Sequence, residues 1–475
     1  MPSIRVKVAS LTLHFNSGIV NAVRLKSIGQ GLWSRSGNRW RQFLRWFEPG
    51  LGIKRWLVLA IFGTALIGLG LAIFLLDIYR ANPDSPWLIL FSLSAFPRWL
   101  RAVLFGGSGV ILLSVSILKL SRSLLAPYVR PGKPIVDAVS RYRRKGRGPR
   151  IAAIGGGTGL STLLRGLKEY SSNIVAIVTM ADDGGSSGRL RRSLGLPPPG
   201  DLRNCLAALS DDEDLLTQLF QYRFLDGELA GHSFGNLFIA ALAGAMGSFE
   251  QGLIEAGRVL AVKGRVLPAT LSDVVLVAEK SLAVDAQSVH VKGESNIPSF
   301  PGRIKMLQLQ PDNPPAYPEA LNALLNADMV IVGPGSLYTS ILPNLLIPDI
   351  VSALKSSRGF KVFVCNIATQ PGETDGYNCR QHYEAITQHI GEGIFDTVVA
   401  NDCFEARLSE NISWVRPPMK GFMTPLYSTD LVDESRPSHH DSKKLSEALI
   451  ALLEERTGPL DFTSLDYLDH IERPN

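Results

Sequence analysis

The sequence predicts a two-part chain: a two-helix transmembrane hairpin followed by a doubly wound, mostly parallel α/β domain. Three observations predict it. Residues 1–150 carry 23 Lys and Arg but only four acidic residues, whereas the rest of the 475-residue chain has a net charge of −13. The basic part contains two long apolar runs, and the acidic part alternates short apolar runs with helical patterns. This asymmetry indicates two physically different modules.

The first apolar run, residues 56–76, has no charged residue and would cross a bilayer core of roughly 30 Å as a helix. Residues 102–118 form a second, shorter run, for which a buried core helix is the alternative. Basic residues precede the first run and follow the second, so both termini and the main domain should be cytoplasmic. We expect two spans in the inner (plasma) membrane. An organelle transit peptide in residues 1–54 stays open.

These features divide the chain into five segments. They are a basic cytoplasmic N-terminal segment (1–55), the transmembrane hairpin (56–120), a basic linker (121–149), a ligand-binding α/β domain (150–456) and a C-terminal tail (457–475). The basic run 141–150 could bind anionic lipid headgroups. Nucleic acid is not an expected partner, because the following domain is acidic and carries no nucleic-acid-binding signature. The four cysteines form no C-x-x-C pair or zinc pattern, which favours buried thiols.

From residue 150 onward, short apolar runs predict strands and longer periodic runs predict helices. The expected strands are 151–154, 174–180, 329–332 and 361–365. The expected helices are 160–169, 202–209, 237–246 and 443–455. Their alternation predicts a doubly wound, Rossmann-like sheet, in which ligands bind beyond the carboxyl ends of the strands. Polar motifs lie at those ends.

The first motif is GGGTG, residues 155–159, directly after a strand and at the start of a helix. Glycines let the backbone approach an anion, and a helix N-terminus presents free N–H groups to it. The motif is not G-x-G-x-x-G, because Leu160 takes the third glycine position, and no Gly-Lys-Ser/Thr of a P-loop follows. The pattern favours an anion-binding turn, with a plain tight turn as the alternative.

The second motif, ADDGGSSG, follows the next strand. Asp182 and Asp183 could hold Mg²⁺ against phosphate oxygens, or accept hydrogen bonds from sugar hydroxyls. Solvated charges in an Asp-Gly turn are the simpler alternative. The glycines, with Ser186 and Ser187, predict a mobile lid or anion-binding loop over residues 184–188. The arginines that follow could clamp phosphate.

Two further motifs precede helices. In PPPGDLRN, Asp201 could cap the helix that starts there, or form part of a site with Arg203 and Asn204. In GHSFGN, His232 has the most site-like setting of the eight histidines, as an acid, a base or a hydrogen-bond donor to phosphate. Ser233 is a candidate N-cap in that motif. No Ser-His-Asp arrangement is evident.

Two later strand ends repeat the pattern. The motif GPGSLYTS, residues 333–340, could cradle another part of the same ligand. Asn366 and Thr369 follow the last predicted strand, where Glu373 and Asp375 are expected to support or cover the site. Each motif alone is a weak signal, but polar loops at successive strand ends predict one shared site.

In this order, the motifs resemble the YvcK/CofD-like family over roughly residues 148–455. The stretches that carry the resemblance are GGGTGLSTLLRGLK, TMADDGGSSGRLR, PPPGDLRNCLAALS, GHSFGNLFIAAL, VKGRVLPAT, GPGSLYTSILPNLL and NIATQPGETDGY. One branch of that family comprises gluconeogenesis factors, which bind UDP-activated amino sugars and support cell shape and wall synthesis. The other comprises Mg²⁺-dependent 2-phospho-L-lactate transferases. The later stretches are more similar to the first branch, and the hairpin is an addition to the soluble family pattern.

The resemblance implies ligand contacts by matching motif. Phosphate would lie against Gly156, Gly157, Thr158 and Gly159, while Asp182 and Asp183 would serve hydroxyls or a metal. The other candidate ligand-binding residues are Ser186, Ser187, Asp201, Arg203, Asn204, His232, Ser233, Asn236, Gly335, Ser336, Tyr338, Thr339, Asn366 and Thr369. No catalytic residue is assigned, and Mg²⁺ is the one cofactor considered.

The leading hypothesis is a membrane-tethered regulator that binds a UDP-sugar of the UDP-N-acetylglucosamine type. Ligand binding would order residues 184–188 and shift the population that a partner recognises, without turnover. Cell-wall synthesis proteins and a second copy of the chain are the expected partners. The alternative is a transferase of the 2-phospho-L-lactate transferase type, in which Mg²⁺ on Asp182 and Asp183 orients a pyrophosphate. A scaffold organised by the hairpin is a third hypothesis, which leaves the polar loops unexplained.

Overall fold

In the computed structural model, the chain divides into two compact units, Met1–Arg143 and Arg144–Asn475. The residues that the structure describes are 62, 64–72, 74, 76, 78, 80, 96–125, 148–210, 218–282, 288–418 and 422–458. The N-terminal segment, most of the first predicted span and of the linker, and nearly all of the C-terminal tail lie outside the described residues.

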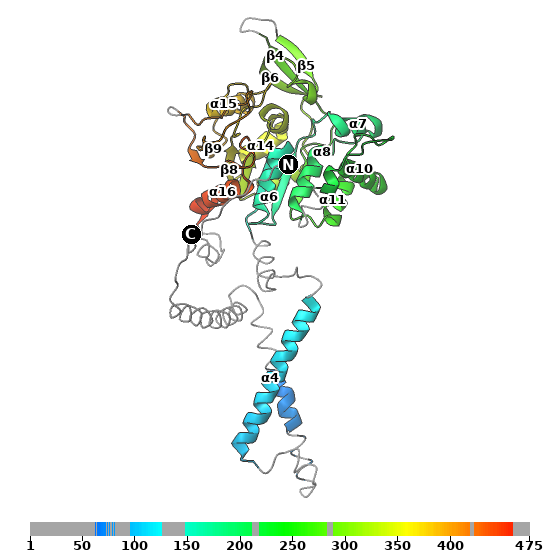
Figure 1. The fold of residues 1–475 in the computed structure, drawn as a ribbon, viewed down its shortest axis with the longest axis vertical. Coiled ribbons are helices and arrows are strands. Elements are labelled where there is room, and N and C mark those ends of the chain that lie inside the picture. Colours follow the sequence, from blue (N-terminus) through cyan, green and yellow to red (C-terminus); the bar gives the residue numbers. More distant parts are fainter. Residues whose placement is uncertain are drawn as a thin grey trace, which may run out of the picture. The chain divides into compact units, whose positions relative to one another are not determined.

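The first unit contains helix α4 (Arg98–Leu125), which extends beyond the second predicted span at both ends (Figure 1). Its apolar side chains include Trp99, Phe105 and Ile111, all exposed within the unit. Residues 64–72 are helical as well. Across the described parts of the chain, no single helix is both long and apolar enough to count as a membrane span.

The second unit is built on a seven-stranded parallel sheet, as predicted. Its spatial order is β10 (Leu426–Thr429), β9 (Thr397–Asn401), β8 (Phe360–Val364), β7 (Met329–Val332), β1 (Ile151–Gly155), β2 (Ile174–Val178) and β3 (Arg265–Pro268). The four predicted strands are β1, β2, β7 and β8, with ends displaced by at most two residues. Every residue of β1 and β7 is buried, which explains their continuous apolar runs.

The order of the strands places a topological switch point between β1 and β7. From β1 the chain moves outward through β2 and β3, and then returns to the other side of β1 to continue through β7, β8, β9 and β10. Ile151 therefore pairs with Ile174 of β2 on one side and with Met329 of β7 on the other. A crevice opens at the carboxyl ends of the strands at such a point.

Helices flank this sheet, and α6 packs against both α8 and α16, while α12 packs against α14. Helix α16 shows how the sequence sets these elements: Asp441 caps its N-terminus by accepting from the Lys443 and Lys444 N–H groups, and Leu445, Leu449 and Leu453 recur on its buried face. The helices are α6 (Gly157–Leu167), α7 (Gly185–Leu194), α8 (Gly200–Leu209), α10 (Phe234–Met246), α11 (Phe249–Val259), α12 (Pro318–Leu325), η3 (Leu337–Ile341), α13 (Leu342–Leu345), α14 (Pro348–Ser356), α15 (Cys379–Ile390) and α16 (Ser442–Thr457).

A small antiparallel sheet, absent from the sequence prediction, follows β3 and is seen at the top of Figure 1. It comprises β5 (Ser288–Lys292), β4 (Val275–Ser281) and β6 (Arg303–Gln310), with the one-turn helix η2 (Glu294–Asn296) between β5 and β6. Lys280 on β4 is buried, and its Nζ donates to the carbonyl oxygens of Ile297 (2.8 Å), Phe300 (2.5 Å) and Gly372 (3.0 Å). This side chain therefore ties the small sheet to the loop that follows β8.

Two local predictions were wrong. Residues 184–188 do not form a loop, because α7 begins at Gly185 and the Gly188 N–H donates to the Gly184 carbonyl. Asp182 Oδ1 accepts from the Gly184 N–H (2.9 Å), and this short turn leads straight into the helix. Asp201 does not cap α8, because the helix begins one residue earlier and Pro199 is its N-cap.

Candidate ligand-binding site at the switch point

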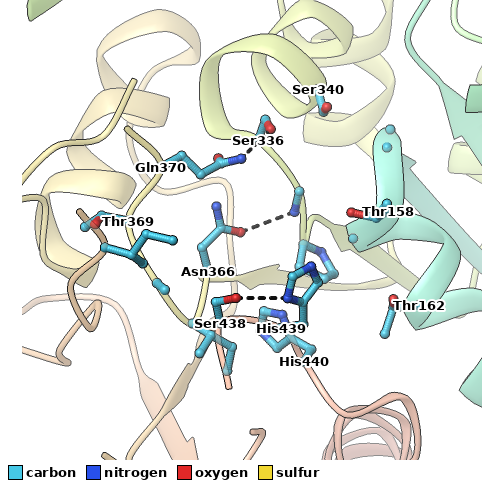
Figure 2. A pocket seen from close by; sticks show the side chains of 18 of the residues that line it. Thr158, Thr162, Ser336, Ser340, Asn366, Thr369, Gln370, Ser438, His439 and His440 are labelled. Carbon is cyan, nitrogen blue, oxygen red and sulfur yellow. Dashed lines mark hydrogen bonds between the residues drawn. The ribbon is translucent and has the colours of Figure 1, made fainter. Parts of the chain in front are cut away.

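A cavity of about 230 Å³ lies at the carboxyl ends of β1, β7 and β8, where the switch point predicts a site. Figure 2 shows its polar side chains converging from four segments of the chain. The lining includes Gly156, Gly157, Thr158, Gly159, Thr162, Gly335, Ser336, Ser340, Asn366, Thr369, Gln370, Ser438, His439 and His440. Eight of the residues predicted from the sequence are among them.

The two glycine-rich turns touch each other through their backbones. A Cβ on Gly159 would come within 2.6 Å of the Pro334 carbonyl oxygen, so no larger residue fits there without a shift. Gly335, with φ of +155°, has a conformation that side chains rarely adopt, and it lies against the Gly156 carbonyl. These glycines let the β1 and β7 turns share one wall of the cavity.

The N-terminus of α6 points into this wall. Its N-cap is Gly156, which offers no side-chain cap to the first N–H groups of the helix, although the Asp201 carboxylate accepts from the Gly157 N–H. Such groups, together with the helix dipole, favour a negatively charged ligand. Thr158 is exposed in this first turn and adds a hydroxyl to the same surface.

The loop after β8 is held in place by hydrogen bonds to the β7 turn. Asn366 Oδ1 accepts from the Gly335 N–H (3.2 Å), and Gln370 Nε2 donates to Ser336 Oγ (2.6 Å) (Figure 2). From below, Asn344 Nδ2 donates to the carbonyl oxygens of Ser340 (2.8 Å) and Gly155 (3.2 Å). The turns are therefore preorganised by side-chain amides, of which the sequence analysis included only Asn366.

Two histidines that the sequence analysis missed complete the cavity. His440 is buried, its Nε2 lies 3.2 Å from the Cys365 carbonyl oxygen, and burial lowers its pKa to about 4. Burial, assisted by the charge of Arg436, also lowers the pKa of His439, whose Nδ1 lies 3.0 Å from Ser438 Oγ (Figure 2). Both rings are therefore neutral near pH 7. The available signal was a run of polar residues directly before the N-cap of α16.

Arg203 and Asn204 line a smaller pocket of about 90 Å³, which shares Thr158, Thr162 and His439 with the main cavity. Arg203 is only 9% exposed, and it donates through Nη1 to Ser233 Oγ (2.6 Å) and through Nη2 to Asn204 Oδ1 (2.9 Å). Burial lowers its pKa, with a further contribution from the charge of Arg223.

Asp201 lies against the first glycine turn, outside both cavities. Its carboxylate accepts from the Gly157 N–H, and a Cβ on Gly156 would meet Asp201 Oδ2 at 2.6 Å. Burial, and then the charge of Asp182, raise the pKa of Asp201 to about 6. Burial is also the largest cause of the raised pKa of Asp182, against hydrogen bonds from the Gly184 N–H and Ser187. These two carboxylates would repel an incoming anion unless a proton or cation accompanied it.

Two glutamates extend this carboxylate cluster. Burial raises the pKa of Glu294, on η2, to about 8, with added effects from the charges of Asp182, Asp183 and Asp201. Burial also raises the pKa of Glu373 to about 7, although its Oε1 accepts from Thr339 Oγ1 (3.2 Å). Its Oε2 is buried and has no hydrogen-bond partner among the described residues. The sequence analysis missed Glu294, because its turn belongs to the unpredicted antiparallel sheet.

The other predicted residues form hydrogen bonds outside the two cavities. Ser186 Oγ lies 3.1 Å from His232 Nδ1, and Asn236 Nδ2 donates to Ser187 Oγ (3.3 Å). Burial lowers the pKa of His232. On the other side, Tyr338 OH lies 3.0 Å from Tyr377 OH. None of these residues, nor Ser233 and Thr339, lines either of the two cavities.

The two carboxylates of the predicted metal pair, Asp182 and Asp183, have different hydrogen-bond partners. Asp183 Oδ1 accepts from the Ser295 N–H (3.0 Å), so this carboxylate is engaged by the small sheet. Among the described residues, no three His, Cys, Asp or Glu side chains are placed to hold a metal ion. Mg²⁺ often uses only one or two carboxylates together with phosphate oxygens. Asp182 and Asp201, beside the glycine turn, are a second pair of neighbouring carboxylates.

Comparisons with known proteins identify the family of the α/β domain. The profile of the family described as 2-phospho-L-lactate transferase CofD matches residues 151–456. A protein of Nostoc sp. named "Putative gluconeogenesis factor" is 47% identical over 389 residues, covering 79% of this chain and 83% of that protein. The Bacillus subtilis "Gluconeogenesis factor" is 44% identical over 321 residues, covering 65% of this chain and 100% of that protein. The Nostoc match is longer than residues 151–475, so it extends into the segment before β1.

A solved structure shares the fold. The crystal structure of a UPF0052 family member from Bacillus halodurans, at 2.60 Å resolution, has 44% sequence identity and a TM-score of 0.59. It covers 64% of this chain and 99% of that chain. The shared part is as long as the α/β domain.

Proposed function

The chain belongs to the CofD/YvcK family, and from this premise we propose that its α/β domain is a gluconeogenesis factor that binds a nucleotide-diphosphate-linked sugar as a regulatory ligand. The ligand class is that of UDP-N-acetylglucosamine. One observation carries the proposal: two glycine-rich turns meet at the switch point around one cavity. Backbone N–H groups at a helix N-terminus suit a diphosphate, and hydroxyl and amide side chains suit a sugar.

The size of the cavity limits how the ligand could lie. At about 230 Å³ it is smaller than the roughly 300–1,000 Å³ of sites that enclose a drug-sized molecule. We therefore expect it to hold the diphosphate and the adjoining sugar, while the nucleoside extends along the strand ends. Burial lowers the pKa of His440 to about 4, which makes it a weak general base near neutral pH and supports hydrogen bonding without turnover.

A transferase acting on a nucleotide-diphosphate-linked substrate is the second candidate. The observation in its favour is the carboxylate pair Asp182 and Asp201 beside the α6 turn. If Mg²⁺ bound there, it would neutralise phosphate oxygens of the ligand. The protein side chains would hold and orient the diphosphate in either case.

Calorimetry on the full chain in mild detergent would test the proposal, with UDP-N-acetylglucosamine titrated with and without Mg²⁺. Asn366→Asp keeps the acceptor for the Gly335 N–H but adds a negative charge at the cavity wall. It should weaken binding about 100-fold or more, because holding the new carboxylate next to the negatively charged diphosphate costs several kcal/mol. The matched control is Asn326→Asp on the exposed end of α12.

The recovered ligand decides between the two candidates. Saturable binding with the sugar nucleotide recovered intact supports the regulator. Mg²⁺-dependent release of UDP or UMP would instead establish the transferase. If the folded protein bound nothing, or if Asn366→Asp and Asn326→Asp bound the ligand equally well, the nucleotide-sugar assignment would fail.

We also propose that the segment before the α/β domain tethers it to the cytoplasmic face of the inner membrane. The apolar runs with basic flanks and the exposed apolar side chains of α4 support this. The test is alkaline carbonate extraction of membranes from cells that express the full chain or residues 144–475. The full chain should stay in the membrane pellet, and its release into the supernatant would refute the tether.

A further inference from the structure

The pocket that adjoins the main cavity has the lining of an anion site. Three arginines, Arg165, Arg203 and Arg436, are among the residues that line it, and no Asp or Glu of the described residues is. Hydroxyl groups of Thr158 and Thr162 complete one side. Because these belong to the first turns of α6, the positive end of the helix dipole acts on this pocket too.

Arg203 gives the strongest indication that a ligand is involved. The side chain is more than nine-tenths buried, yet it forms no ion pair with any described residue. Its two terminal nitrogens donate to neutral oxygens, and its Nε has no hydrogen-bond partner among the described residues. The charges of Asp201 and Asp182 act on Arg203 without forming an ion pair with it, so a ligand in the pocket would supply the direct counter-charge that the buried guanidinium lacks.

Arg436 gives the pocket an exposed second cation. Its Nη2 lies 3.4 Å from Asp433 Oδ2, a loose contact that leaves the side chain 59% exposed. The pocket volume of about 90 Å³ corresponds to roughly three water molecules. That is enough for one tetrahedral oxyanion and too little for a nucleoside.

We propose that this pocket, between α6, Arg203 and Arg436, is a second ligand site that binds a single phosphate group. The phosphate would be either free inorganic phosphate or the terminal group of a small phosphomonoester. Bidentate contacts from guanidinium groups suit phosphate geometry. The site does not depend on the proposed function, although it shares Thr158, Thr162 and His439 with the main cavity.

Shared walls imply coupling between the two ligands. Each anion would lie near the N-terminus of α6, so binding of one should weaken binding of the other by electrostatic repulsion. Two separate sites give a weakening that reaches a plateau at saturation. One shared site gives competition, in which the apparent Kd rises without limit as the second ligand is added.

The test is calorimetric titration of the full chain with inorganic phosphate and, separately, with glycerol 3-phosphate, each with and without saturating UDP-N-acetylglucosamine. Arg436→Gln should weaken phosphate binding about ten-fold. Arg203→Lys, which keeps the charge but loses the planar fork, should weaken it at least as much, with the far-UV spectrum unchanged. Arg258→Gln, an exposed arginine on α11 paired with Glu255, is the matched control and should bind as the wild type does.

The outcomes separate this inference from the proposed function. Phosphate binding that depends on Arg436 supports the site even if the sugar nucleotide does not bind at all. Tighter binding of glycerol 3-phosphate than of inorganic phosphate identifies a phosphomonoester ligand, and the reverse order identifies free phosphate. Unlimited competition with the sugar nucleotide, absence of phosphate binding, or equal loss in Arg258→Gln would each overturn the second site.

Discussion

The glycine turns after β1 and β7 and the carboxylate cluster beside them lie at the same edge of the sheet but differ in charge. The turns have no charged side chain, and their backbones touch, as at Gly159 and Pro334. The cluster contains Asp182, Asp201, Glu294 and Glu373. Burial raises the pKa of all four carboxyl groups, and the charges of Asp182, Asp201 and Glu373 raise that of Glu294 further.

This difference indicates that the two regions have separate roles in ligand binding. The turns present backbone N–H groups and carry no charged side chain of their own, which suits an anion. The cluster holds protons near neutral pH, so it responds to any cation or anion that arrives next to it. Changes that affect one region and leave the other intact therefore test the division.

The largest effect should come from Lys280→Met, which removes the support of the carboxylate cluster. Its Nζ donates to three backbone carbonyls. Two of them belong to the turn between β5 and β6, which carries Glu294, and the third belongs to the loop that carries Glu373. Leaving those carbonyls unsatisfied should lower the free energy of unfolding by about 3 kcal/mol. Urea denaturation measures it.

The matched control lies on the same small sheet. Lys292 on β5 is exposed, and among the described residues its Nζ donates to Gln310 Oε1 (2.9 Å). Lys292→Met should change the stability by less than about 0.5 kcal/mol. Equal losses in both variants would mean that the buried contacts of Lys280 do not hold the cluster together.

A smaller effect, with a defined pH dependence, is expected for Glu294→Gln. The folded-state pKa of about 8 exceeds the ordinary value of 4.5, so the folded protein binds more protons than the unfolded chain between these values. The contribution of Glu294 to stability is therefore complete below pH 4.5 and is lost as the pH rises through 8.

The Gln variant should thus be more stable than the wild type at pH 8.5, by about 2 kcal/mol, and nearly equal to it at pH 5. Denaturation curves at the two pH values measure the difference. An equal change at both would show that packing, rather than charge, is what the substitution alters.

The sequence predicted the glycine side of this comparison better than the carboxylate side. Strand ends followed by glycines are local signals, and they located Gly156–Gly159, Gly335, Ser336, Asn366 and Thr369 in the cavity. Ser438, His439 and His440 were missed because no glycine-rich turn marks them, and their local signal is the run of polar residues before the N-cap of α16. Local patterns could have found them.

The carboxylate cluster depends on tertiary contacts that no local pattern contains. Glu294 reaches the cluster only because the unpredicted β5–β6 turn places Ser295 on Asp183. The partner that Asp182 gains from the fold is Asp201, which the start of α8 places against the β1 turn. Adjacency in sequence suggested the pair Asp182 and Asp183, and only the fold brings Asp201 to the same group of carboxylates.

The smallest predicted effect separates these two arrangements. At pH 8, above its pKa of about 6, Asp201 is ionised beside the α6 turn, so Asp201→Asn should tighten binding of UDP-N-acetylglucosamine in the absence of Mg²⁺ by about five-fold, or about 1 kcal/mol. At pH 5 the wild-type carboxyl is already protonated and the gain should shrink. The Asp201→Asn variant should also lose any enhancement of binding by Mg²⁺.

The control is Asp183→Asn, which changes the carboxylate that accepts from the Ser295 N–H. It should neither tighten binding nor remove an effect of Mg²⁺. If calorimetry shows the gain with Asp183→Asn instead, the adjacent pair Asp182 and Asp183 acts on the ligand, and the division between the two regions is drawn in the wrong place.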